Sequence, residues 1–341
     1  MVRVYLDHNA TAPLRAEARA AMIAAMDVVG NPSSVHQEGR AARALIERAR
    51  AQVAAGIGCR PREVVFTSGA TEAAGVLARW PGPVEVQETA HDALWVHRRP
   101  EAEGRPILAM GLANSETGII TDPPADRPGA LLLDVTQAVG RVPFSFARSG
   151  ADLAILSAHK LGGPKGVGAL IVREGLDIAA LATGGGQEMG RRSGTENIIG
   201  IAGFGAAIEV AMADLEAGIW ERVEEIRNIL ERVLAESENE TIFVGKGDRR
   251  LPNTSCFIAP GWKGETQVMA MDLAGFAVSA GAACSSGKVR ESRVLRAMGH
   301  DAGAAASAIR VSLGPATTGE EIARFATIWA AQWKRHCARA A

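Results

Sequence analysis

Short apolar runs alternate with helical patterns along most of this chain, and this alternation limits the fold more than any other feature. It is typical of an α/β protein whose sheet is largely parallel. One helical pattern covers 40–55. A second covers 198–234, which is too long for one ordinary helix and predicts a break near Ala217 and Gly218. The runs that predict strands lie at residues 64–66, 83–86, 107–110, 130–133, 153–156 and 169–172.

The pattern changes after Pro252, where short strand signals precede an amphipathic helix predicted over 319–335. A chain of 341 residues is long enough for one large domain and one smaller domain. We expect a large domain over 12–245. The small domain should combine 1–11 with 246–341, because we expect the extreme N-terminus to pack on the C-terminal part.

Composition gives no sign of a nucleic-acid or membrane partner, since the formal net charge is only −1. The N-terminus carries Asp7 and His8 where a signal peptide needs apolar residues. The apolar stretch 200–215 is interrupted by Glu209 and Asp214, which we expect to exclude a membrane span. We therefore expect a cytoplasmic protein.

Cysteine spacing argues against both a zinc site and a disulfide framework, and no metal is expected. Each cysteine is then either a small buried hydrophobe or a reactive thiol. The four lie far apart, at Cys59, Cys256, Cys284 and Cys337.

Polar residues follow two of the predicted strands, at the sheet edge where ligands gather in parallel α/β proteins. Asp134, with Gln137 after it, ends the run 130–133. It is either a helix N-cap or a carboxylate that keeps a pyridine nitrogen protonated. Lys160 follows the run 153–156. It is either part of a glycine-rich surface turn or an amine that forms a Schiff base.

A third strand end, 67–72, opens a helix with small residues whose backbone N–H groups suit a phosphate, although a simple capping box explains it equally. Nucleotide-binding motifs fail on spacing. The segment 281–288 has five residues between Gly and Gly-Lys and so is not a P-loop, and Gly184 to Gly186 open no dinucleotide fingerprint.

Taken in order, these segments resemble the cysteine desulfurases, which are class V aminotransferase relatives with the fold-type I architecture of pyridoxal-phosphate enzymes. The resemblance runs nearly end to end. It implies an α/β fold in which a large domain, with a mainly parallel sheet flanked by helices, binds the cofactor beside a smaller α/β C-terminal domain. The motifs are YLDHNAT at 5–11, GNPSSVH at 30–36, FTSGATE at 66–72, SAHK at 157–160, RSGTEN at 192–197, SAGAACSSGK at 279–288 and IRVSLG at 309–314.

The resemblance also implies residue roles. Lys160 would form the Schiff base with pyridoxal 5'-phosphate, Asp134 would pair with the pyridinium, and Gln137 would bond the phenolic oxygen. His91 would stack on the ring, although alone it reads as an ordinary polar histidine. The phosphate would be bound by Ala70, Thr71, Ser157 and His159, with Thr195 joining from the other subunit of a homodimer. Asn31 and Arg310 would bind L-cysteine, with Arg310 as a bidentate clamp on its carboxylate.

Cys284 aligns with the catalytic cysteine of the family, in a segment of small residues that suits a loop carrying sulfur. The implied reaction converts L-cysteine to L-alanine and leaves a persulfide on Cys284, for delivery to an acceptor protein such as an iron–sulfur scaffold. The other three cysteines we expect to be buried and structural. A related lyase or aminotransferase, such as a selenocysteine lyase, and a catalytically silent partner-binding protein remain alternatives.

The chain departs from the family pattern in two places. Ser115 stands where the family usually has an asparagine that contacts the cofactor. The region between Thr71 and Asp134 is condensed, so that His91 and Asn114 lie close in sequence, and Ala74-Gly75 replaces a usual Asn pair. We expect the surface near the cofactor entrance to be rebuilt.

Overall fold

The computed structural model describes residues 3–236, 240–280 and 291–340 and divides the chain into two compact units. We call residues 11–113 and 121–216 the sheet unit. Residues 1–10, 114–120 and 217–341 form the terminal unit. The expected boundary near residue 245 thus differs from the observed division, because helix α6 (Ile219–Glu236) packs on helix α10 (Gly319–Ala340).

The segment 114–120 joins the terminal unit through its backbone. Ile120 N–H donates to Arg249 C=O at 2.8 Å, and Leu251 N–H donates to Gly118 C=O at 2.7 Å. The sequence predicts this segment to lie in the large domain, over 12–245. Its assignment depends on pairing with residues about 130 positions away, which no local pattern shows.

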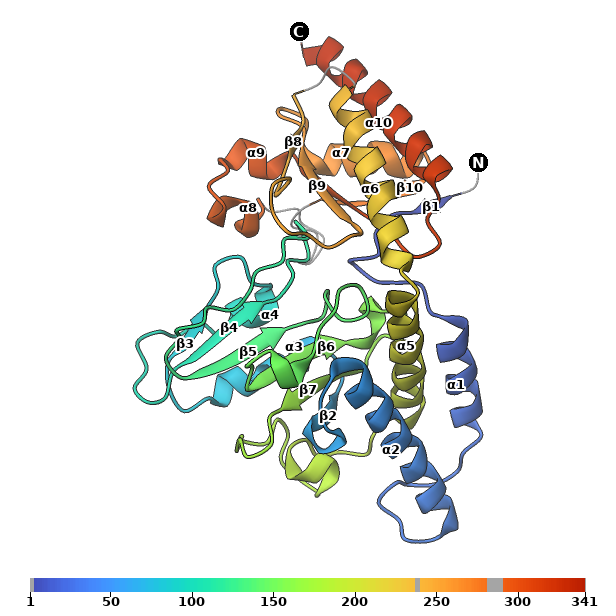
Figure 1. The fold of residues 1–341 in the computed structure, drawn as a ribbon, viewed down its shortest axis with the longest axis vertical. Coiled ribbons are helices and arrows are strands. Elements are labelled where there is room, and N and C mark those ends of the chain that lie inside the picture. The colour runs from blue at the N-terminus through green and yellow to red at the C-terminus, as the bar shows by residue number, and fades with distance from the viewer. Residues whose placement is uncertain (1–2, 237–239, 281–290, 341) are drawn as a thin grey trace. The chain divides into compact units, whose positions relative to one another are not determined.

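The sheet unit is built on six strands in the order β2-β7-β6-β5-β4-β3 (Figure 1). Neighbours from β3 to β6 are parallel, whereas β7 is antiparallel to both β2 and β6. All six predicted strands are confirmed. The bounds are β2 (Val64–Thr67), β3 (Val84–Val86), β4 (Ile107–Gly111), β5 (Ala130–Asp134), β6 (Leu153–Ser157) and β7 (Gly168–Val172).

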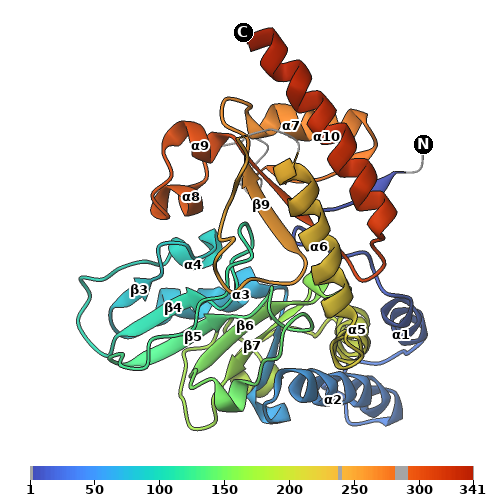
Figure 2. The same cartoon turned by 45° about the horizontal axis from the view of Figure 1, so that its top comes forward.

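Successive side chains of these strands point to opposite faces, and both faces are covered by helices. Phe66 meets Phe204 of helix α5 (Ile198–Glu216), with ring centroids 6.3 Å apart. Helices α1 (Ala16–Met26) and α2 (Gln37–Ile57) pack on α5 in the same layer (Figure 2).

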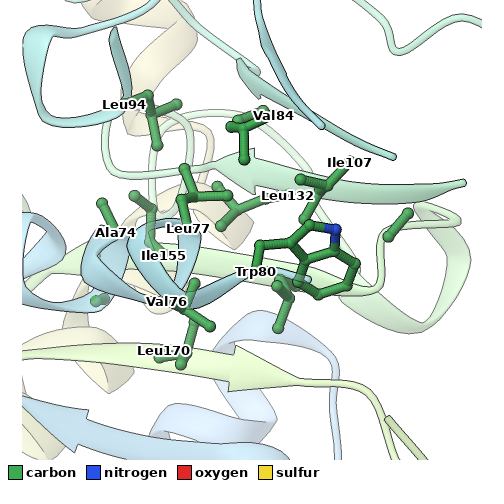
Figure 3. Close-up of a cluster of buried hydrophobic side chains, with 14 of the residues drawn as sticks. Ala74, Val76, Leu77, Trp80, Val84, Leu94, Ile107, Leu132, Ile155 and Leu170 are labelled. Atoms are coloured by element: carbon green, nitrogen blue, oxygen red, sulfur yellow. The ribbon is translucent and has the colours of Figure 1, made fainter. Parts of the chain in front are cut away.

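The opposite face is covered by helix α3 (Ala70–Ala74), the 3₁₀ turn Gly75–Arg79 and helix α4 (Asp92–Trp95). Figure 3 shows Leu77 and Trp80 lying over side chains of the strands, including Ile107 and Leu132. Trp80 also donates its indole N–H to Arg105 C=O at 2.8 Å. This core holds α3 at the end of β2, where the predicted phosphate-binding residues lie.

Helix α5 ends where the sequence predicted a break, because Gly218 takes a left-handed φ of 70° before α6 begins. By length and composition α5 could cross a membrane, which our expectation from Glu209 and Asp214 had excluded. Half of its apolar window is buried, and it packs against α1 and α2. A buried core helix has these same properties.

The terminal unit contains a four-stranded antiparallel sheet in the order β11-β12-β9-β8. The expected packing of the N-terminus on the C-terminal part is confirmed, since strand β1 (Val4–Tyr5) pairs with β10 (Phe276–Ala277). The predicted C-terminal helix is confirmed as α10, whose fully buried Trp329 contacts Phe257. Its other elements are β8 (Ile242–Phe243), β9 (Thr254–Ile258), α7 (Gly264–Leu273), β11 (Ser279–Ala280), α8 (Arg293–Ala297), α9 (Ala302–Ala306) and β12 (Ala308–Ser312).

Candidate active site

The ends of β2 and β6 are held close together by the strand between them. Thr67 and Ser157 both lie opposite Gly168 of β7. A Cβ atom at residue 168 would come within 2.7 Å of Gly69 Cα, so glycine allows this close approach. Ala70 N–H then donates to Ser157 Oγ at 2.8 Å. The structure therefore brings together the two segments predicted to bind a phosphate.

The start of α3 has a capping contact, which is one of the two interpretations that the sequence left open, and phosphate binding stays a prediction. Glu72 accepts a hydrogen bond from Ser68 N–H at 2.6 Å, as a capping residue does. The exposed Thr71 occupies the second position of the helix. Because Ala70 N–H is used by Ser157, we expect the hydroxyls of Ser157 and Thr71 to be the main phosphate donors here.

Glu72 also attaches the segment that carries Thr195. Arg192 donates from Nε to a Glu72 oxygen at 2.9 Å. Burial alone would raise the pKa of Glu72, but the hydrogen bonds from Arg192 and Ser68 outweigh it, and the pKa lies below its usual value. Thr195 itself is exposed. An exposed position suits the predicted role toward a second subunit.

Lys160 and His159 lie in a 3₁₀ turn, Ala158–Lys160, directly after β6. Both side chains are half-buried. His159 Nδ1 lies 3.2 Å from Thr11 Oγ1, and Ala12 N–H donates to His159 C=O at 2.8 Å. Burial, followed by the charges of Lys160 and Lys165, lowers the pKa of His159 to about 4. Without a ligand the imidazole is therefore uncharged at neutral pH, and a neutral imidazole can meet a phosphate as a hydrogen-bonding group.

Asp134 is the last residue of β5, between Gly111 of β4 and Ile155 of β6. Its Oδ1 accepts from Thr136 N–H at 3.0 Å, which is the turn-capping contact that the sequence allowed. The buried Thr136 Oγ1 has no hydrogen-bond partner among the described residues. This edge of the sheet therefore has a buried hydroxyl whose hydrogen-bonding groups the described side chains do not satisfy.

Gln137 is buried, and its amide is oriented by a residue that the sequence reasoning missed. Arg141 donates from one guanidinium nitrogen to Gln137 Oε1, and from the other to Lys160 C=O at 2.8 Å. A basic residue four positions after Gln137 was the only signal in the sequence. The spacing could not show that the side chain also reaches the next strand end.

His91 is exposed and caps helix α4, where its Nδ1 accepts from Ala93 N–H at 3.1 Å. An acceptor at Nδ1 places the proton of the neutral ring on Nε2. Stacking of this ring on a cofactor stays a prediction.

The two predicted substrate-binding residues lie in different units. Asn31, in the sheet unit, is exposed in the turn before α2, where its Oδ1 accepts from Ser33 N–H at 2.9 Å. Arg310, in the terminal unit, is buried on β12.

The guanidinium of Arg310 is held by its own unit. It donates to Asp7 Oδ1 at 2.6 Å and to Ser115 C=O at 2.9 Å, while its Nε has no partner among the described residues. Asp7 Oδ2 also accepts from Ser279 Oγ at 2.8 Å. Ser115, which replaces the asparagine that contacts the cofactor in the family pattern, thus contributes its backbone carbonyl to the contacts of Arg310.

The cysteines divide by exposure. Cys284 lies outside the described residues. Cys256 is buried and Cys59 is partly buried. Burial, followed by the charge of Glu116, raises the pKa of Cys256 to about 12. Burial, followed by the charge of Glu63, raises the pKa of Cys59 to about 12. Cys337 is exposed, so the expectation that it is a buried structural cysteine is wrong. It lies near the end of α10, where an outward-facing position needs no apolar residue.

The polar groups at these strand ends fit pyridoxal phosphate. Hydroxyl groups and a neutral imidazole lie at the ends of β2 and β6 for the phosphate, and a carboxylate ends the neighbouring β5. An oriented amide and a lysine amine complete the set, and all of these residues belong to the sheet unit.

Comparison with known proteins agrees with this site. The family described as aminotransferase class-V matches residues 4–91 and 105–325, and the match is interrupted inside the condensed region. A cysteine desulfurase of Frankia sp. strain EuIK1 is 41% identical over 94% of this chain and 88% of that protein. One of Cereibacter sphaeroides is 39% identical over 95% and 94%.

Solved structures give the same result. A NifS-like protein from Rickettsia africae superposes with a TM-score of 0.88 at 28% identity, covering 97% of this chain and 99% of that one. A second NifS-like protein superposes with a TM-score of 0.87 at 29% identity, covering 98% and 100%. The chain therefore belongs to the class-V aminotransferase family of pyridoxal-phosphate enzymes, in the branch of the cysteine desulfurases.

Proposed function

We propose that this chain takes sulfur from L-cysteine, stores it as a persulfide on Cys284 and releases L-alanine. The observation that carries the proposal is the position of Lys160, Gln137 and Asp134 at adjacent strand ends, in a chain 41% identical to a cysteine desulfurase. We assign the sulfur to Cys284 because its segment, SAGAACSSGK at 279–288, resembles the motif of the catalytic cysteine in this family.

Pyridoxal phosphate, when bound, supplies a ring that withdraws electrons from the bonds of an attached amino acid. Asp134 would hold a proton on the ring nitrogen. Gln137 would donate from its amide nitrogen to the ring oxygen, because its Oε1 already accepts from Arg141. The amine of Lys160 would hold the cofactor between turnovers, remove the Cα proton of the substrate and return a proton to Cα before alanine leaves.

The sulfur step conserves atoms and electrons. The thiolate of Cys284 attacks the sulfur of L-cysteine, forming the S–S bond of a persulfide as the Cβ–S bond of the substrate breaks. The carbon keeps the electron pair of that bond and takes up a proton, which gives alanine. An ordinary cysteine thiol has a pKa of about 8.5, so a neighbouring group must favour the thiolate at neutral pH. We assign this task to His91.

Three finer features belong to the same proposal. The enzyme works as a homodimer, in which Thr195 completes the phosphate site of the partner subunit. A fully active monomer in sedimentation would contradict this.

The persulfide is delivered to an acceptor protein of iron–sulfur cluster assembly, in the cytoplasm. Transfer of labelled sulfur from the loaded enzyme to a purified scaffold protein tests the acceptor, and cell fractionation tests the compartment.

The test compares Cys284→Ser with Cys337→Ser, which removes the exposed cysteine of α10. Cys284→Ser should bind the cofactor normally, lower alanine release by orders of magnitude and carry no persulfide by intact mass. Cys337→Ser should match the parent in all three. Alanine release at the parent rate from Cys284→Ser would indicate a different lyase chemistry.

A further inference from the structure

Arg141 is a buried arginine at a tight turn beneath the cofactor residues. Its side chain is 4% exposed, and Gly140 before it takes a left-handed φ of 73°. A Cβ at residue 140 would meet Ala211 of α5 at 2.8 Å, so glycine lets the turn pack on this helix. The turn therefore places the Arg141 side chain beside Gln137 and Lys160, which follow β5 and β6.

The guanidinium of Arg141 joins two cofactor residues that come from different strands. One nitrogen donates to Gln137 C=O at 3.1 Å and to Gln137 Oε1. The other donates to Lys160 C=O at 2.8 Å. Gln137 follows β5 and Lys160 follows β6, so this one planar group spans the two segments.

These contacts determine which end of the Gln137 amide can meet a ligand. An amide has an acceptor at Oε1 and donors at Nε2, and a rotation of half a turn exchanges them. Arg141 has only donors, so it favours the rotamer with Oε1 toward itself. The Nε2 group is then the donor presented on the other side.

We propose that Arg141 is a positioning residue for the cofactor, acting through Gln137 and through the backbone of Lys160. It sets the amide orientation and the spacing between the group that bonds the ring oxygen and the lysine that holds the cofactor. This inference rests on the assigned cofactor. It is specific to arginine, because a lysine ammonium is a single point and cannot form the same planar fork toward both segments.

The test uses Arg141→Lys, with Arg173→Lys as a matched control. Arg173 also donates from its guanidinium to two backbone carbonyls, those of Ala151 at 2.7 Å and Phe146 at 3.1 Å. Its guanidinium carbon lies 4.8 Å from the centroid of the Phe146 ring. Arg173 follows the last residue of β7, whereas Ser157 of the site lies opposite Gly168 at the start of that strand. Loss of its fork should therefore affect stability without affecting the cofactor.

Three quantities are measured for each purified variant: the visible absorbance of bound pyridoxal phosphate, the pH midpoint of that absorbance, and the melting temperature without cofactor. Arg141→Lys should shift the absorbance and its pH midpoint and weaken cofactor affinity about tenfold, the lower end of the effect seen when residues that orient metal ligands are changed. Arg173→Lys should lower the melting temperature alone. Equal melting shifts in both variants, with parental absorbance and pH midpoint in Arg141→Lys, would overturn the proposal.

A second variant covers the case in which Arg141→Lys does not fold. Gln137→Glu keeps an acceptor for Arg141 but removes the amide donor, so it should shift the absorbance while Arg141 stays in place. An unshifted spectrum would overturn the role assigned to the amide. A parent protein that binds no pyridoxal phosphate would instead refute the assigned cofactor, which keeps the two failures distinct.

Discussion

The residues predicted to bind the cofactor and Arg310, the residue predicted to bind the substrate carboxylate, are held in different ways. In the sheet unit, the cofactor residues bond to one another's segments, as in the pairs Ala70–Ser157 and Arg141–Lys160. In the terminal unit, the charged fork of Arg310 is already paired with Asp7. A cofactor that stays bound can be held by polar groups that are already fixed in position, because these groups then need no reorganisation when it binds.

A substrate that enters and leaves at each turnover imposes a different requirement. A buried guanidinium without any partner would be costly between turnovers, so a carboxylate of the chain beside it lowers that cost. In its predicted role, Arg310 would require the carboxylate of L-cysteine to share the guanidinium with Asp7 or to displace Asp7. We call the cofactor residues of the sheet unit the frame; they are Asp134, Gln137, Ser157, His159 and Lys160. We call Arg310, with Asp7, the clamp. We expect damage to the frame to abolish cofactor chemistry, and damage to the clamp to raise KM for the substrate.

The largest effect is expected from Lys160→Ala, which removes the amine from the frame. The variant should lose the absorbance of lysine-bound cofactor and all measurable alanine formation, and it should keep the parental melting temperature without cofactor. Lys165→Ala is the matched control, because it removes an exposed lysine five residues away. Turnover by Lys160→Ala, or its loss in Lys165→Ala, would show that the wrong lysine has been assigned.

A smaller and different effect is expected from Arg310→Lys, which keeps the charge but loses the planar fork. Hydrogen bonds to charged groups contribute about 1.5–3 kcal/mol, so kcat/KM for L-cysteine should fall about 10- to 100-fold, mainly through KM. Cofactor absorbance should not change. Steady-state kinetics against cysteine concentration measures this.

Arg250→Lys is the control for the clamp. Arg250 is a buried fork in the same unit, paired with both oxygens of Glu231 at 2.7 and 3.0 Å. This variant should lose stability and keep the parental KM. A change of cofactor absorbance in Arg310→Lys, or an unchanged KM, would break the distinction between frame and clamp.

The frame could be located from the sequence because strand ends carry a local signal. Leu131, Leu132 and Leu133 are fully buried, and such an apolar run marks a strand covered on both faces. The polar residue that ends each run then lies at the edge where ligands gather. Asp134 and Ser157 are indeed the last residues of β5 and β6.

The contacts that orient these residues could not be predicted in the same way. Arg141 reaches across to Lys160, and Arg310 meets Asp7 across 303 positions of sequence. Such pairs depend on tertiary packing, and neither residue changes the hydrophobic pattern around it. The unit boundary was missed for a related reason: the amphipathic pattern of α6 shows that it buries one face, but not which unit it packs on.

The smallest effect is expected at His159, where the frame can be probed without activity. The pKa of His159 is about 4 in the folded protein and 6.5 in an unperturbed histidine. Between these values the unfolded chain binds more protons than the folded one. The contribution of His159 to stability is therefore complete above pH 6.5 and is lost as the pH falls toward 4.

His159→Gln keeps a polar group near Thr11 but cannot titrate. Without cofactor, its melting temperature should fall less steeply than that of the parent between pH 6.5 and 4, and the two profiles should run parallel above pH 7. Solvent screens this half-buried site, so the difference should be a few degrees at most. Profiles that stay parallel down to pH 4 would mean that the folded protein protonates His159 as readily as the unfolded chain does. A histidine that titrates freely in this way would not be held by the frame, and its neutral role beside the phosphate would have to be abandoned.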